Sequence, residues 1–159
     1  MEYGPRALGN RSVLYRTTDA SVRDWLNRKL KRASYMPFAP VTLDSAAADC
    51  YGRMDRAADA GRFMTVSYDA TDRMRGQSPG VVHLDGTVRP QILRRRDNPG
   101  MYRLLEEYHR LTGLPSLLNT SFNLHHEPIV ADSQDACRSF VESDLDAMVM
   151  GPFLVTRKG

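Results

Sequence analysis

Residues 114–123 read Leu-Pro-Ser-Leu-Leu-Asn-Thr-Ser-Phe-Asn, an apolar run that changes within a few positions to small polar side chains. The segment 114–119 is typical of a buried strand. Side chains at i and i+2 of an extended chain point the same way, so we expect Ser121 and Asn123 to project together from the strand's end. A hydroxyl and an amide there offer donors and acceptors to a phosphate or a carbonyl. The alternative is a polar turn that only caps the strand.

The segments on either side predict a chain in which strands and helices alternate. Apolar spacing and capping residues predict helices over 19–31, 46–53, 98–113 and from 132 or 133 through 141. Strands are predicted at 12–16, 40–43, 63–68, 81–83, 87–93, 147–150 and 153–156, and a loop at 73–79. Asp85-Gly86 is expected to turn the chain between the strands at 81–83 and 87–93. The pattern indicates an α/β or α+β domain with a mixed, twisted sheet flanked by helices.

Two of these helices carry a clear apolar stripe. We expect the inward residues of the helix at 98–113 to be Met101, Leu104, Leu105, Tyr108 and Leu111. In the helix that begins at 132 or 133 we expect Ala136, Cys137, Phe140 and Val141 to face inward.

Length and composition are those of one globular domain. The 159 residues are 42% hydrophobic and 26% charged, with a net charge of +3. Basic residues cluster at 23–32 and 94–96, which suits a phosphate-bearing ligand without demanding nucleic acid. Two distant cysteines, no signal-peptide pattern and no apolar stretch of membrane-spanning length predict a cytoplasmic protein with free thiols and no membrane contact.

Other candidate functional residues lie in three short segments. Arg6 and Arg11 stand in a loop rich in Gly and Pro, and guanidinium groups bind phosphate or carboxylate as forks. In the segment 83–89, an extended chain would align His83, Asp85, Thr87 and Arg89, whereas a turn at Asp85-Gly86 would align only Thr87 and Arg89. His83 itself can be a ligand, a base or a structural histidine. The adjacent residues 125–127, His-His-Glu, lack the helical spacing of a metal site.

Four ordered motifs together resemble the C-terminal domain of the nodulation- and antibiotic-type O-carbamoyltransferase family. They are Glu-Tyr-Gly-Pro-Arg-Ala-Leu-Gly-Asn-Arg-Ser at 2–12, Pro-Phe-Ala-Pro at 37–40, His-Leu-Asp-Gly-Thr-Val-Arg at 83–89 with Gln91, and Leu-Asn-Thr-Ser-Phe-Asn at 118–123 with Glu-Pro-Ile-Val at 127–130. The resemblance covers essentially the whole chain, 1–159, and implies a YrdC-like fold with a concave, positively charged face.

The resemblance also implies an activity. Domains of this kind condense carbamoyl phosphate with ATP, with Mg²⁺ present, to give carbamoyl-adenylate and pyrophosphate. A separate actin-like N-terminal domain with an iron (Fe²⁺) site then passes the carbamoyl group to a sugar or antibiotic hydroxyl. That domain is absent from this chain, so we expect it as a partner in cis or as a second polypeptide. The sequence is also compatible with a homodimer.

Residue by residue, the resemblance implies catalytic roles for Arg89, Ser121 and Lys31. It implies phosphate or carbamoyl binding by Arg6, Arg11, Arg32, Thr120 and Asn123. The chain departs from the common family run Lys-x-Arg-Glu-x-aromatic-Arg-Pro-Phe at three positions, where it has Leu30, Ala33 and Met36. We expect these guanidinium groups and the Ser121 hydroxyl to converge on a single hollow.

Two other functions remain open from the sequence. One is a non-catalytic YrdC-like module that binds RNA or a partner protein through its basic concavity. The lack of aromatic residues among the basic clusters weighs against stacking on single-stranded RNA. The other is a degenerate domain kept only for packing against a partner, which the loss of the arginine at Met36 makes conceivable.

Overall fold

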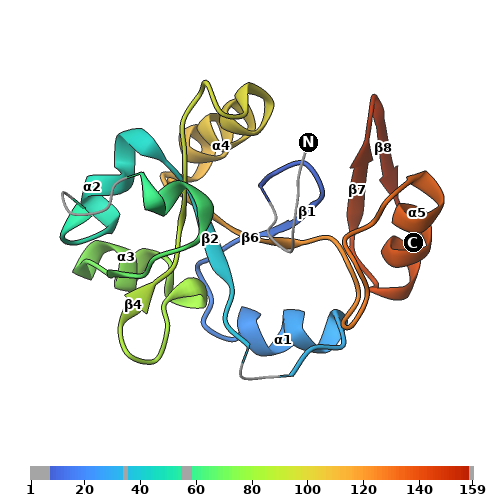
Figure 1. Ribbon diagram of the computed structural model, residues 1–159, viewed down its shortest axis with the longest axis horizontal. Coiled ribbons are helices and arrows are strands. Elements are labelled where there is room, and N and C mark those ends of the chain that lie inside the picture. Colours follow the sequence, from blue (N-terminus) through green and yellow to red (C-terminus); the bar gives the residue numbers. More distant parts are fainter. Residues whose placement is uncertain (1–7, 34–35, 55–58, 158–159) are drawn as a thin grey trace.

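A four-stranded mixed sheet forms the centre of the protein (Figure 1). The computed structural model describes residues 8–33, 36–54 and 59–157. The strand order is β1 (Ser12–Tyr15), β6 (Ser116–Ser121), β2 (Ala39–Leu43) and β5 (Gln91–Leu93). β6 is antiparallel to both of its neighbours, whereas β2 and β5 are parallel. The predicted α/β class with a mixed sheet is confirmed.

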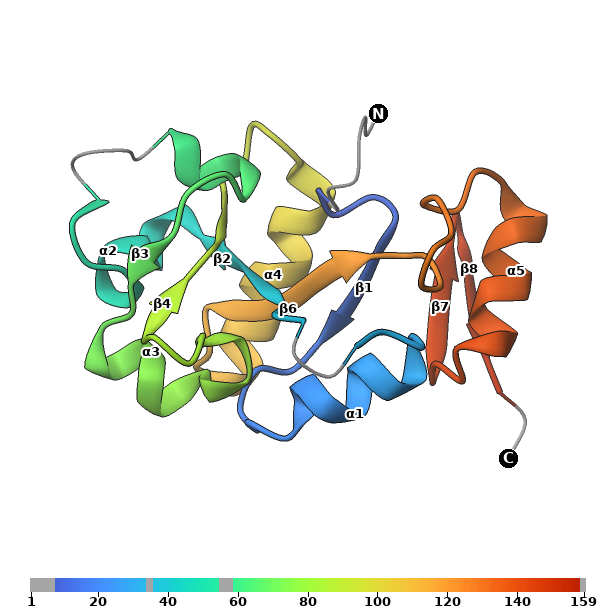
Figure 2. The same cartoon turned by 60° about the horizontal axis from the view of Figure 1, so that its bottom comes forward.

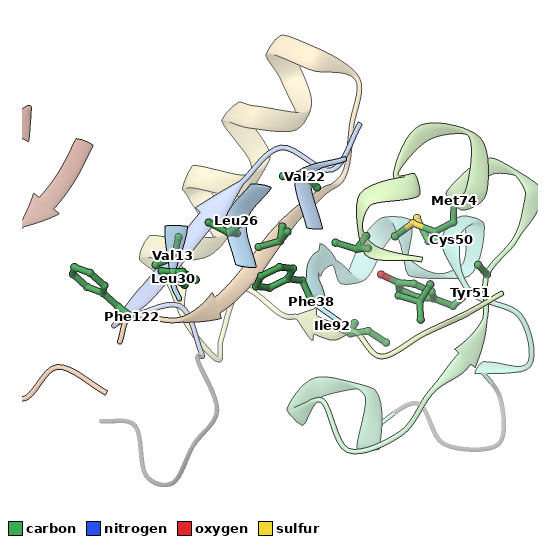
Figure 3. Packing of buried hydrophobic residues seen from close by; sticks show 14 of the residues in the cluster. Val13, Val22, Leu26, Leu30, Phe38, Cys50, Tyr51, Met74, Ile92 and Phe122 are labelled. Atoms are coloured by element: carbon green, nitrogen blue, oxygen red, sulfur yellow. The ribbon is translucent and has the colours of Figure 1, made fainter. Parts of the chain in front are cut away.

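Helices cover both faces of this sheet, as the two views show (Figures 1 and 2). α4 (Pro99–Thr112) packs on one face and α1 (Val22–Lys29) on the other. β6 serves both faces: Leu117 joins the core under α4, and Leu118 joins the core with Leu26 of α1. We call these the α4 face and the α1 face. Figure 3 shows the α1-face core, in which Leu26 and Leu30 lie near Val13.

The remaining elements form the two ends of the molecule (Figure 1). At one end lie η1 (Asp44–Ala46), α2 (Ala47–Cys50), η3 (Ala60–Phe63), β3 (Tyr68–Asp69), α3 (Asp72–Gln77), η4 (Pro79–Val81) and β4 (Thr87–Val88). At the other end, α5 (Ser133–Glu142) packs on the hairpin of β7 (Ala147–Met150) and β8 (Phe153–Thr156). Among the described helices, none combines the length and apolar character needed to cross a bilayer.

Helix boundaries follow local capping chemistry. The Asn98 side chain accepts a hydrogen bond from the Met101 N–H, and Gly113 ends α4 in the left-handed region, as predicted. Asp132 caps α5 in the same way. Asp19 does not cap α1, which begins at Val22; its carboxylate instead accepts hydrogen bonds from the backbone and hydroxyl of Ser21.

The structure corrects several predicted elements between residues 63 and 93. The predicted strand 63–68 does not form, because Met64 adopts φ of 56°, a left-handed conformation that interrupts an extended chain. The predicted loop 73–79 contains α3, because the Thr71 hydroxyl caps a helix there. Residues 81–83 form no strand, since Pro79 starts a 3₁₀ turn.

The predicted strand 87–93 is divided by Pro90 into β4 and β5. Proline has no N–H to donate to a ladder, so pairing is interrupted at this position. β4 pairs with β3, whereas β5 joins the main sheet beside β2.

The two predicted helix stripes are only partly correct. Leu104 and Leu111 of α4 are exposed, and the helix instead buries Tyr102 between Met101 and Leu105. In α5, Val141 and Cys137 are exposed, and Ser139 is buried beside Phe140.

Gly80 gives a test of how tightly η4 packs on the start of α1. Its N–H bonds to the Thr17 carbonyl, and a Cβ at this position would lie 2.5 Å from Val22 Cγ1 and 2.7 Å from the Asp19 carbonyl oxygen. We predict that Gly80→Ala lowers the free energy of unfolding by about 1–3 kcal/mol, the cost typical of overpacking. Urea denaturation measures this. Gly76→Ala is the control: a Cβ there meets nothing within 4 Å, so no loss is expected.

Candidate functional site

One edge of the central sheet gathers residues that are far apart in sequence. β1, β2 and β5 begin at this edge, and β6 ends there, as the pairs Ser12–Ser121, Ala39–Asn119 and Val41–Gln91 show. Neighbouring strands lie about 4.8 Å apart, so the four strands span about 14 Å along the edge. We call it the β6 edge.

Each strand that begins at the β6 edge is preceded by an arginine. Arg11 comes directly before β1, Arg89 lies two residues before β5, and Arg32 stands on the connection into β2. The order of the strands therefore distributes three guanidinium-bearing positions along the edge at which Thr120 and Ser121 end β6. Arg6 lies outside the described residues.

Thr120 and Ser121 lie on opposite faces of the sheet. Thr120 pairs with Val13 and lies on the α1 face, as Leu118 does. Ser121 lies on the α4 face together with Asn119, because residues two apart in a strand share a face. The Arg32 guanidinium donates to the Thr120 hydroxyl over 3.4 Å. On the other face, the Asn119 amide donates to Gln91 Oε1 over 2.7 Å.

Arg32 is a half-buried cation without a counter-ion in the described part of the chain. Its Cζ lies 4.6 Å from the centroid of the Phe38 ring, and its hydrogen bond goes to the neutral Thr120 hydroxyl. Loss of hydration on burial lowers the pKa of this guanidinium. Burial of an uncompensated charge is unfavourable, and a bound anion would offset it. Arg32 is therefore a candidate anion-binding group at this edge.

The backbone places Lys31 and Arg32 in different directions. Lys31 adopts φ of 55°, and the N–H groups of Lys31 and Arg32 bond to the carbonyls of Arg28 and Asn27 in a Schellman motif that ends α1. The Lys31 ammonium is exposed, 3.8 Å from Glu142 of α5. The described contacts of Lys31 thus lead to α5, and those of Arg32 lead to β6.

The loop after β6 is held by two of the predicted binding residues. Arg11 Nη1 donates to the Val130 carbonyl over 2.8 Å. Asn123 Nδ2 donates to the carbonyls of Leu124 and Glu127 over 2.7 and 3.2 Å. The prediction that Ser121 and Asn123 project together required an extended chain beyond the strand. The chain is not extended there, because the Asn123 N–H turns back to the Ser121 carbonyl. A role for either side chain toward a ligand stays a prediction.

The segment before Arg89 contains the turn that the sequence left open. Gly86 has φ of 79°, and the N–H of His83 bonds to the Thr87 carbonyl, so the chain reverses at Asp85-Gly86. His83 Nδ1 lies 3.1 Å from the Thr87 hydroxyl, and Nε2 is buried without a described partner. Burial lowers the pKa of His83; Asp85 opposes this shift and Arg89 adds to it. The geometry thus favours a neutral, structural His83.

The three departures from the family run receive a partial explanation. Leu30 is 1% exposed and belongs to the α1-face core, so this position serves packing rather than charge. The Met36 carbonyl accepts a hydrogen bond from the buried Asn27 side chain, but any residue offers this carbonyl, so the bond does not explain the methionine. Nothing in the structure explains Ala33.

The segment 125–127 does not assemble a metal site in the described structure. The His125 and His126 rings lie 3.7 Å apart, while Glu127 forms a two-pronged ion pair with Arg138 of α5. Within the described ranges, no three His, Cys, Asp or Glu side chains are grouped to hold a metal ion.

Sequence reasoning did not single out Gln91 and Asn119 as site residues. Both are buried, and their amide pair links β5 to β6 across β2 on the α4 face. The available signal was an amide two residues after Arg89 and another two residues before Ser121, each within a strand.

Comparison with known proteins defines the family of this domain. Residues 1–157 match the family described as Carbamoyltransferase C-terminus, and the chain belongs to this family. It is 40% identical over 160 residues to nodulation protein NolO of Bradyrhizobium diazoefficiens, covering 99% of this chain and 29% of that relative. It is 37% identical over 136 residues to nodulation protein U of Rhizobium tropici, covering 86% of this chain and 23% of that relative.

A further relative is an uncharacterized protein of Methanocaldococcus jannaschii. It is 41% identical over 157 residues, which is 99% of this chain and 30% of that protein. The chain therefore spans less than a third of the length of these curated relatives.

The left-handed backbone of Lys31 gives a stability test. Glycine adopts this conformation without the Cβ clash, so we predict that Lys31→Gly raises the free energy of unfolding by about 1 kcal/mol. Arg28→Gly, in the last turn of the same helix, should lower it by about 1 kcal/mol. Chemical denaturation measures both, and equal losses in the two variants would contradict the assigned geometry.

The ion pairs of Arg138 give a pH test. Hydrogen bonds from Arg138 lower the pKa values of Glu127 and Asp135 in the folded domain. Their contribution is therefore complete above the unfolded-state pKa values, about 4.3 and 3.9, and is lost as the pH falls through the lower folded-state values. Arg138→Met should reduce the melting temperature at about pH 6 and have a much smaller effect at about pH 2. A pH-independent difference would exclude this linkage.

Proposed function

We propose that this domain forms carbamoyl-adenylate from carbamoyl phosphate and ATP. Hydrolysis releases inorganic phosphate from carbamoyl phosphate and leaves carbamate. A carbamate oxygen then attacks the α-phosphorus of ATP, a new P–O bond forms, and pyrophosphate leaves. The family to which the chain belongs supports carbamoyl chemistry, and the β6 edge supports the anionic substrates.

The observation that carries the proposal is the guanidinium of Arg32 at the end of β6, which has no counter-ion among residues 8–33, 36–54 and 59–157. It lies 3.4 Å from Thr120 on an edge that also holds Arg89 and Ser121. Carbamate and a triphosphate are both anions, so their approach requires cations that are already in place. An edge of about 14 Å is long enough to align two such reactants.

Each residue has a definite role in this proposal. Arg32 and Arg89 neutralise the phosphates and the developing charge, and the Thr120 and Ser121 hydroxyls orient phosphate or carbamoyl oxygens. Arg11 and Asn123 hold the loop after β6, which fixes the end of the strand. Lys31 contributes the positive charge of its exposed ammonium from the surface between α1 and α5. Arg6 is a further proposed phosphate ligand.

Mg²⁺ enters the proposal with the nucleotide. The described residues offer no cluster of carboxylates for it, and Mg²⁺ is commonly bound by substrate phosphates with its own waters. Its chemistry is to neutralise the triphosphate, while the protein's own groups bind and orient the reactants.

Transfer of the carbamoyl group to an acceptor hydroxyl requires a further domain in this proposal. We propose that an actin-like domain with an iron site, in cis or as a separate cytoplasmic chain, transfers the carbamoyl group to a sugar or antibiotic hydroxyl. The length of the curated relatives supports this division, since the chain covers 23–30% of those described above.

Pyrophosphate formation tests the proposal directly. The domain is incubated with ATP, Mg²⁺ and carbamoyl phosphate, and pyrophosphate and adenylate products are measured. We predict that Arg89→Ala and Ser121→Ala each lower the rate at least about 100-fold, the loss typical of a removed transition-state donor, with the fold retained by circular dichroism.

The matched control is Arg103→Ala, which removes an exposed arginine from α4 and should leave the rate unchanged. Near-normal pyrophosphate release from both site variants would exclude Arg89 and Ser121 as catalytic residues. Absence of carbamoyl-phosphate-dependent pyrophosphate from the unmodified domain and from a full-length relative would exclude the reaction.

A further inference from the structure

Three residues that have no role in the proposed chemistry lie next to one another on the α4 face. Ala39, Gln91 and Asn119 each belong to a different one of the sequence motifs that resemble the family. Ala39 pairs with Asn119, and Val41 of the same strand pairs with Gln91. The sheet thus brings parts of three separate motifs to one place beside the β6 edge.

A side-chain hydrogen bond joins β5 to β6 across the strand between them. Asn119 Nδ2 donates to Gln91 Oε1 over 2.7 Å, although β2 separates the two strands in the sheet. Adjacent strands lie about 4.8 Å apart, so the bond connects backbones that are about 10 Å apart. The small side chain of Ala39 shares a face with its partner Asn119 and leaves room for the two amides to meet. We call this hydrogen bond the amide bridge.

The amide bridge is shielded from water. Gln91 is 4% exposed, Asn119 is 1% exposed, and Ala39 below them is 4% exposed. Breaking a hydrogen bond in such surroundings leaves a buried polar group without that partner, which is unfavourable. The bridge therefore restrains the position of β5 relative to β6.

This restraint acts where the backbone ladder of β5 begins. Pro90 has no N–H to donate, and the pairing of β5 with β2 starts at Gln91. Before the proline, β4 pairs with β3 in a separate two-stranded sheet. Arg89 thus lies between two sheets, and its position relative to the main sheet depends on how Gln91 is held.

Each amide of the bridge is two residues away from a group that the proposed reaction uses. Arg89 precedes Gln91 by about 6.6 Å of extended chain, and no turn or bend interrupts the chain between β4 and β5. Ser121 follows Asn119 in β6 and shares its face. Arg89 and Ser121 therefore adjoin strands that are not neighbours in the sheet, and the amide bridge connects these strands directly.

The surroundings of Gln91 are electrically neutral. Gln91 lines a pocket of about 390 Å³ together with Phe63, and the charged residues among the described lining, Arg62 and Asp97, form a bidentate pair over 3.1 and 2.6 Å. A carboxylate in the bridge would compete with anionic substrates for the nearby Arg89 guanidinium. Two amides link the strands without adding a charge.

We propose that the amide bridge is a positioning device: it holds Arg89 and Ser121 at the separation that aligns carbamate with the α-phosphorus of ATP. This assignment rests on the proposed function. Alignment of two reactants acts mainly on the chemical step, whereas contacts that are equal in the ground state and the transition state act on KM. Loss of the bridge therefore lowers kcat and leaves the KM for ATP unchanged.

Three leucine variants separate positioning from stability. Gln91→Leu and Asn119→Leu each leave one buried amide without its bridge partner, so both should lower the midpoint of urea denaturation. The double variant removes both amides, so its midpoint should return toward that of the unmodified domain. We predict that kcat for pyrophosphate formation is at least about ten-fold lower in all three variants, with an unchanged KM for ATP.

Ser116→Ala is the matched control. It removes the hydrogen bond between the Ser116 and Thr42 hydroxyls, 2.7 Å long, which joins β6 to β2 at the other end of β6. This variant should lower the urea midpoint and leave kcat unchanged. Recovery of kcat together with the midpoint in the double variant would show a purely structural bridge and overturn the assignment. A raised KM with unchanged kcat would make Gln91 a ligand contact and would also overturn it.

Hydrogen exchange gives a readout that does not depend on activity. The backbone amides of residues 89–92 should exchange faster in Asn119→Leu, a substitution in β6, than in Ser116→Ala. Equal exchange in these two variants would exclude the coupling of the strands. The two proposals fail separately. Pyrophosphate formation with normal kcat in the leucine variants leaves the reaction and removes the positioning role. Faster exchange in a domain that forms no pyrophosphate leaves the coupling and removes the reaction.

Discussion

The position of β6 between two hydrophobic cores is the constraint on which the other features depend. Its hydrogen bonds are taken on both sides, by β1 and β2, and its side chains alternate between the α1 face and the α4 face. A shift of one residue in the pairing of β6 would move each of its side chains to the opposite face, so that Leu117 and Leu118 would leave the cores in which they pack. This register therefore fixes Thr120 on one face and Ser121 on the other, at the edge where the strand ends.

Electrostatics differ sharply between neighbouring parts of this edge. Most of the arginines that form ion pairs in the described part of the chain lie at the surface, as Arg138 does with its acidic neighbours. Arg32 instead lies half-buried against Phe38, and its guanidinium donates to the Thr120 hydroxyl and to no carboxylate of the described residues. Arg62 forms a bidentate ion pair with Asp97. The contrast separates a place that favours an anion from a place that favours a neutral group, along a single row of strands.

The connection from α1 into β2 explains why adjacent residues of the chain lie in different parts of the molecule. Leu30 is buried in the core, Lys31 turns in a left-handed conformation toward α5, and Arg32 returns toward β6. Because of one Schellman motif, three consecutive residues thus lie in the core, at the surface near α5 and at the candidate site. Pro90 has a similar effect before β5. The pairing of β4 with β3 ends at this proline, and Gln91 then begins the strand that joins the main sheet beside β2.

The sequence by itself determined the fold class, the capped helix α4, the strands β1, β2 and β6 and the family resemblance, because these depend on local capping and short apolar runs. It indicated a turn at Asp85-Gly86 but left an extended alternative open, which the structure excludes. It failed between residues 63 and 83, where a left-handed Met64, a capping Thr71 and a turn at Pro79 outweighed the apolar pattern. Only the tertiary structure decided that Arg62 is paired with Asp97 and that the Arg32 guanidinium meets the Thr120 hydroxyl, since those partners come from distant segments. It alone also joined Gln91 to Asn119 and placed Phe63 in the same pocket as Gln91, because strand order and register, rather than spacing along the chain, bring these side chains together.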